Sequence, residues 1–80
     1  MLNKIIKILI EVSDIPQNER GNINGGTGMP RFQLVDKNKI LHVKSRVEEE
    51  LSMKISSELM KEWLDKTVGW IIPKLLEKRS

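Results

Sequence analysis

Apolar and polar positions alternate at the start of the chain. Over residues 2–12 one apolar set occupies even positions: Leu2, Ile6, Ile8, Ile10 and Val12. Period two and many β-branched side chains are typical of a β-strand. A second apolar set has helical spacing, which makes a helix the alternative: Leu2, Ile5, Ile6, Leu9 and Val12. β-propensity favours the strand.

Alternation returns at residues 31–44, where we predict a β-hairpin. A two-residue turn at Lys37 and Asn38 would sort the side chains by face. The core face would carry Phe32, Leu34, Leu41 and Val43. The other face would carry Arg31, Gln33, Val35, Ile40, His42 and Lys44. Because Lys-Asn is not a favoured turn pair, a four-residue turn is the alternative.

Between these segments, residues 13–30 are rich in glycine, proline and polar side chains. This composition predicts a long flexible loop. Gly21, Gly26 and Thr27 match part of a phosphate-binding loop, but the lysine of that motif is missing. We therefore expect a loop without a phosphate site.

The last third of the chain has a helical period, with an N-cap at Ser56 or Ser57. The apolar stripe is Leu59, Met60, Trp63, Leu64 and Val68. Gly69 and Pro73 favour a second helix, and one helix kinked at Pro73 is the alternative. Residues 45–55 predict a short helical turn around 46–51 and an extended link, with a strand as the alternative.

These elements predict one α+β domain over residues 1–80. A small antiparallel sheet, formed by the N-terminal strand and the hairpin, would pack against C-terminal helices. A domain of 80 residues buries roughly 60% of the surface of its unfolded chain. We therefore expect a thin core, and self-association or a partner becomes a reasonable expectation.

Catalytic chemistry has few candidate groups here. The chain has no cysteine and one histidine, His42, so we expect no catalytic centre, no metal and no cofactor. Lys4, Lys7 and Glu11 interrupt the apolar N-terminal run, which makes it too short to span a membrane. A soluble, cytoplasmic protein is the expectation.

Basic residues are concentrated in the first half of the chain. Through Arg46 there are eight Lys and Arg against four Asp and Glu. The predicted hairpin could therefore lie on the phosphate backbone of DNA or RNA, in a small regulatory protein. The candidate nucleic-acid residues are Arg31, Gln33, Lys37, Lys39, His42, Lys44 and Arg46. A solvated sheet face explains the same charges.

Residues 51–65 resemble the strand and first helix of ribbon-helix-helix DNA-binding proteins. That fold needs a full second helix, whereas the following segment is short and contains Pro73. The resemblance is therefore local, and no family follows from it.

A second candidate surface contains a tryptophan. Trp63 belongs to the apolar stripe and is expected in the core, whereas Trp70, Ile71 and Ile72 form an apolar group near the helix break. This group, the tryptophan surface, could bind a protein partner, as in the small inhibitors and adaptors of phages and mobile elements. Packing within the chain explains it equally well. A homodimer is compatible with either function.

Overall fold

A computed structural model describes residues 1–79 of the chain, and within this range the protein is helical. About 70% of the chain lies in helices, and no β-strand occurs in the described residues. The α-helices are α1 (Leu2–Ser13), α2 (Lys37–Leu51), α3 (Ser57–Trp63) and α4 (Ile71–Arg79). The 3-10 helices are η1 (Gln17–Asn22), η2 (Met29–Phe32) and η3 (Val68–Trp70). The α+β prediction is therefore wrong.

The N-terminal segment is the helix α1, not the expected strand. Its buried face is made by Ile5, Ile8 and Leu9, which combines residues from both predicted patterns. The helix ends at Asp14, which has a left-handed conformation with φ 53° and donates its N–H to Ile10. A strand here would leave its backbone groups unpaired, because the described residues offer no sheet for it to join.

The predicted hairpin is also absent. The Asp36 side chain caps the segment that follows it, accepting a hydrogen bond of 2.8 Å from the Asn38 backbone N–H. Asp36 therefore starts a helix where the hairpin needed a turn. Val43 and Val47 form the buried side of α2, and Ile40 and Leu51 pack at its margin. The helical turn expected around 46–51 is present, but it is the last part of α2, which begins at Lys37, and an extended link follows it.

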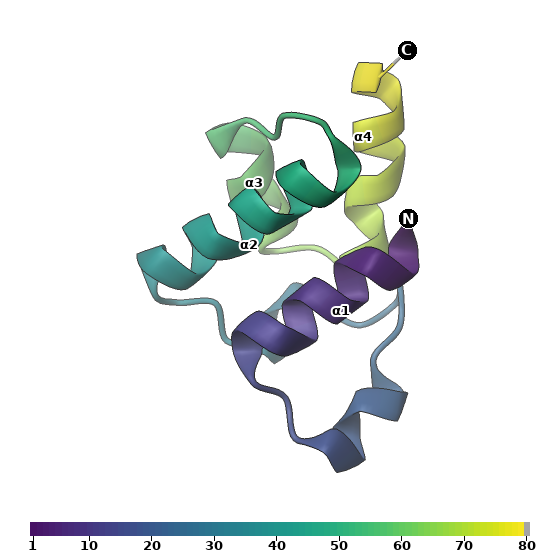
Figure 1. Cartoon of the computed structure of the whole chain (residues 1–80), viewed down its shortest axis with the longest axis vertical. Helices are drawn as coiled ribbons and strands as arrows, with labels where there is room; N and C mark the ends of the chain where they lie inside the picture. Colours follow the sequence, from purple (N-terminus) through teal and green to yellow (C-terminus); the bar gives the residue numbers. More distant parts are fainter. Residues whose placement is uncertain (80) are drawn as a thin grey trace.

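Helices α1 and α2 pack against each other in antiparallel directions (Figure 1). Two ion pairs join them: Lys4 lies 3.7 Å from Glu50, and Arg46 lies 2.6 Å from Glu11. Helices α3 and α4 complete one end of the molecule, and η1 lies at the opposite end of its 37 Å long axis (Figure 1).

The C-terminal prediction is confirmed in outline. Ser56 caps α3 by accepting a hydrogen bond from the Leu59 N–H at 3.1 Å. Trp63 is fully buried, and its indole N–H donates to the carbonyls of Thr67 and Val68, each at 3.2 Å. α3 and α4 are separate helices with Pro73 in the first turn of α4, so they are not one kinked helix.

Residues 13–30 are folded against the rest of the chain. Gly69 donates its N–H to the Gly25 carbonyl at 2.9 Å, and Met29 donates to the Lys66 carbonyl at 2.8 Å. Ile15, Ile23 and Met29 are buried in the core. The expectation of a flexible loop did not account for these three apolar anchors.

Candidate functional site

Helices α2 and α3 face each other across an apolar groove, which we call the α2–α3 groove. Four residues of α2 line it, at successive helical positions of one face: Lys37, Ile40, Leu41 and Lys44. The other side has the same spacing on and just after α3: Ser57, Met60, Lys61 and Leu64. The two helices therefore present matched stripes to a shared space.

The inner surface of the groove is apolar and open to solvent. Its volume is about 260 Å³, and Ile40, Leu41, Met60 and Leu64 are its apolar lining residues. Leu41 is 49% exposed, although the predicted hairpin placed it in the core. A large aliphatic side chain exposed beside a hollow is a feature of binding surfaces.

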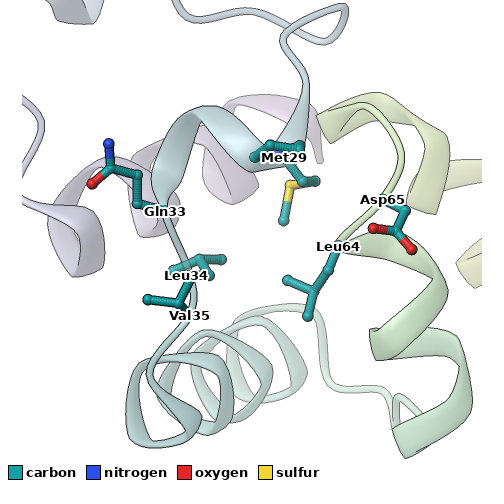
Figure 2. Close-up of a pocket in the computed structure, with 7 residues that line it drawn as sticks. Met29, Gln33, Leu34, Val35, Leu64 and Asp65 are labelled. Carbon is teal, nitrogen blue, oxygen red and sulfur yellow. The ribbon is translucent and has the colours of Figure 1, made fainter.

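A second hollow continues this apolar surface. It has a volume of about 400 Å³ and shares Leu64 with the α2–α3 groove. Figure 2 shows Leu34 and Val35 on one side of it and Leu64 on the other, with Met29 between them. Val35 is 90% exposed. The two hollows are therefore adjacent and meet at Leu64.

Local interactions fix the elements around this surface. The Asp36 cap sets the start of α2, and the Ser56 cap sets the start of α3. Glu48 joins the two, because its carboxylate accepts a hydrogen bond of 2.6 Å from the backbone N–H of Ile55 in the connecting link. Asp36 and Ser56, which do not line the groove, therefore fix where the two helices on its sides begin.

The margin of the groove is positively charged. Lys44 lies 3.5 Å from the Glu48 carboxylate, which partly neutralises it. Lys37 and Lys61 are exposed and make no ion pair within residues 1–79. Lys37 also lies at the N-terminus of α2, where the helix dipole adds positive potential and Asp36 offsets part of it.

The predicted nucleic-acid residues are dispersed by the helical fold. Arg31 pairs with Glu19, and Arg46 pairs with Glu11, so both arginines are engaged with carboxylates. Lys39 and His42 are exposed on α2 but do not line the groove. The other three members of the set border the two hollows: Lys37, Lys44 and Gln33.

The tryptophan surface is largely part of the core. Ile71 is fully buried, and Trp70 and Ile72 are partly buried against the core cluster. Lys74 lies over the Trp70 ring, with Nζ 5.5 Å from the ring centroid, a cation–π contact within the chain. Packing within the chain therefore accounts for most of the apolar area of this group.

Two further features bear on the kind of site. Within residues 1–79, His, Cys, Asp and Glu side chains nowhere gather in the groups of three that could hold a metal ion. None of the helices described over the same range is long and apolar enough to cross a membrane.

Sequence reasoning missed the α2–α3 groove, although its signal is present. Lysine and apolar residues recur at positions 37, 40, 41 and 44, and a similar set recurs at 57, 60, 61 and 64. The spacing is that of a helix face, but it is hidden when residues 37–44 are assigned to a hairpin. No protein-family model, curated protein or solved structure matches the chain.

Proposed function

We propose that the chain is a non-catalytic protein-binding module, an adaptor or inhibitor, that receives its partner in the α2–α3 groove. The observation that carries the proposal is the half-exposed Leu41 beside an open apolar hollow. At protein interfaces a few side chains that fill desolvated pockets contribute most of the binding energy. The adjoining hollow, which Val35 lines, extends the contact area and could receive a second apolar side chain of the partner.

The site offers little support for catalysis. His42 is exposed and lies outside both hollows, and Asp65 is the only carboxylate among the residues that line them. General acid-base chemistry needs a positioned acid and base, or a nucleophile with its base.

The composition supports a cytoplasmic location. Structural disulfides do not persist in a reducing compartment, and a chain without cysteine does not depend on them.

Leucine-to-arginine variants test the proposal with a matched control. Leu41 and Leu76 are 49% and 50% exposed, each on an α-helix, but only Leu41 lines the groove. Leu41→Arg should reduce partner retention in a nuclease-treated pull-down by about tenfold, the loss expected when one anchor is removed. Leu76→Arg should retain the partner. Equal retention by both variants would refute the groove as the interface.

Nucleic-acid binding is the second candidate, now through helix α2 in place of the hairpin. Exposed Lys37 and Lys39 near the positive end of α2 support it. The carboxylate partners of Arg31 and Arg46 count against it. Loss of every partner after nuclease treatment would favour this candidate over the first.

A further inference from the structure

We infer that the partner's docking segment is an acidic amphipathic helix with two large apolar anchors, one for each hollow. This inference rests on the proposed function and specifies its ligand. The two hollows are adjacent, share Leu64 and are both open to solvent. Helices that bind in grooves present anchors at successive turns of one face, which matches two adjacent hollows.

The shape of the site favours a helix over a small molecule. The site consists of two adjacent open hollows, of about 260 and 400 Å³, whereas a small-ligand site is usually one pocket of about 300–1,000 Å³. One apolar side chain of the partner would enter the α2–α3 groove, beside the half-exposed Leu41. The second anchor would enter the larger hollow, between Val35 and Leu64.

Charge complementarity makes the partner acidic. Three lysines border the α2–α3 groove: Lys37, Lys44 and Lys61. No carboxylate is among the residues that line it. Only Lys44 has a carboxylate partner within the described residues. Glutamates that flank the first anchor would therefore meet Lys37 and Lys61, whereas lysines would meet like charge.

The test uses synthetic helical peptides of about 15 residues and the full chain. All peptides carry the same leucine and phenylalanine face, and their polar positions are glutamate-rich, glutamine-rich or lysine-rich. Fluorescence anisotropy should show the glutamate-rich peptide binding about tenfold more tightly than the glutamine-rich one, with the difference shrinking in high salt. The lysine-rich peptide should bind most weakly.

Charge reversal on the protein provides the controls. The double variant Lys37→Glu, Lys61→Glu should bind the glutamate-rich peptide about tenfold more weakly and prefer the lysine-rich peptide. The control Lys39→Glu reverses one lysine of α2 outside the groove, which is half the charge change of the double variant, and it should alter affinity less than about twofold. Circular dichroism spectra matching the wild type would establish that the variants are folded.

The outcomes separate this inference from the proposed function. If peptides of every charge bind equally and Leu41→Arg abolishes all binding, the acidic partner is refuted and the groove remains the interface. If no peptide binds, the helical partner is refuted, and the pull-down with Leu41→Arg decides the proposed function separately. If Leu41→Arg changes nothing in either experiment, both are refuted. A duplex oligonucleotide or a fatty acid that binds where the peptides do not would overturn both. Both would also be overturned if the wild-type protein is a dimer and Leu41→Arg is a monomer, because a second copy of the chain would then occupy the groove.

Discussion

Glu11 and Arg46 form an ion pair that links α1 to α2. Arg46 Nη1 donates a hydrogen bond of 2.6 Å to Glu11 Oε2. This hydrogen bond, more than the surrounding charge, lowers the pKa of Glu11 below its ordinary value of 4.5. A lowered pKa in the folded state means that ionised Glu11 stabilises the fold, and acid removes that stabilisation.

Replacing Glu11 should therefore change how stability depends on pH. At neutral pH, Glu11→Gln should unfold at lower urea concentration than wild type. Because the stabilisation is complete above pH 4.5 and disappears as pH falls through the lowered pKa, the two urea midpoints should converge in acid.

The control is Glu49→Gln, because Glu49 is exposed on α2 and makes no ion pair with the side chains described within residues 1–77. Urea titrations from neutral pH to about pH 3 would measure both differences. A gap between wild type and Glu11→Gln that stays constant into acid would contradict the role assigned to the pair.

Glu48 illustrates what sequence cannot specify at the residue scale. Its place in a run of three glutamates indicates a solvated face or a helix N-terminus. In the structure its carboxylate instead binds the Ile55 N–H and lies 3.5 Å from Lys44. That hydrogen bond forms only because the link after α2 turns back toward Glu48, and this turn belongs to the tertiary structure, which the local sequence pattern does not specify.

Among the elements, the segment between α1 and α2 is held by its contact with η3. Gly25 and Gly69 approach closely, and a Cβ placed on Gly69 would lie 3.2 Å from the Gly25 carbonyl oxygen. The same oxygen accepts the Gly69 N–H at 2.9 Å. A Cβ at position 69 would therefore press on the same carbonyl oxygen that accepts the hydrogen bond of the Gly69 N–H.

Alanine substitutions at two glycines test this packing. Gly69→Ala should destabilise the protein by about 1 kcal/mol, which lowers the melting temperature of a domain this size by roughly 4–8 °C. Gly21 also lies in a 3-10 helix, but nothing is within 4 Å of a Cβ there. Gly21→Ala should leave the melting temperature unchanged or raise it slightly.

Thermal unfolding followed by circular dichroism measures both effects. Equal melting temperatures for the two variants would contradict the packing of this segment on η3. They would favour the flexible loop that its composition predicts.

Predictability differed sharply between elements. α3 and α4 were predictable because their apolar spacing, the Ser56 cap and Pro73 all indicate helices. α1 was ambiguous because a run rich in isoleucine fits period two and helical spacing at once. α2 was missed because Asp36, its cap, was assigned to a strand end. Whether residues 37–44 form a helix or a hairpin therefore depended on recognising Asp36 as the N-cap.

At the scale of the whole molecule, these errors combined into the wrong fold class. The N-terminal strand was predicted from β-propensity and the hairpin from alternation, and the three predicted strands together made a sheet. Part of the core prediction survived: Phe32, Leu34 and Val43 are buried, as expected from the hairpin faces. Leu41 is the exception, and its exposure creates the candidate site.

The candidate site was therefore only partly predictable. Lys37 and Lys44 were singled out for their charge, and both border the α2–α3 groove. Its α3 side was not predicted: Met60 is buried in the core, as the apolar stripe predicts, and Leu64 is partly buried, but nothing in the stripe indicates that they also border a groove beside Lys61. A groove between helices far apart in the sequence depends on their packing, and no local pattern specifies that packing.

The central claim is that a protein partner occupies the α2–α3 groove, and site-specific photo-crosslinking tests it most directly. A photoreactive amino acid would replace Leu41 in one variant and Leu76, of equal exposure, in the other, in the cells that produce the protein. The account predicts a discrete, nuclease-resistant crosslinked protein from position 41 and none from position 76. Crosslinks of equal yield from both positions, or to nucleic acid alone, would contradict it.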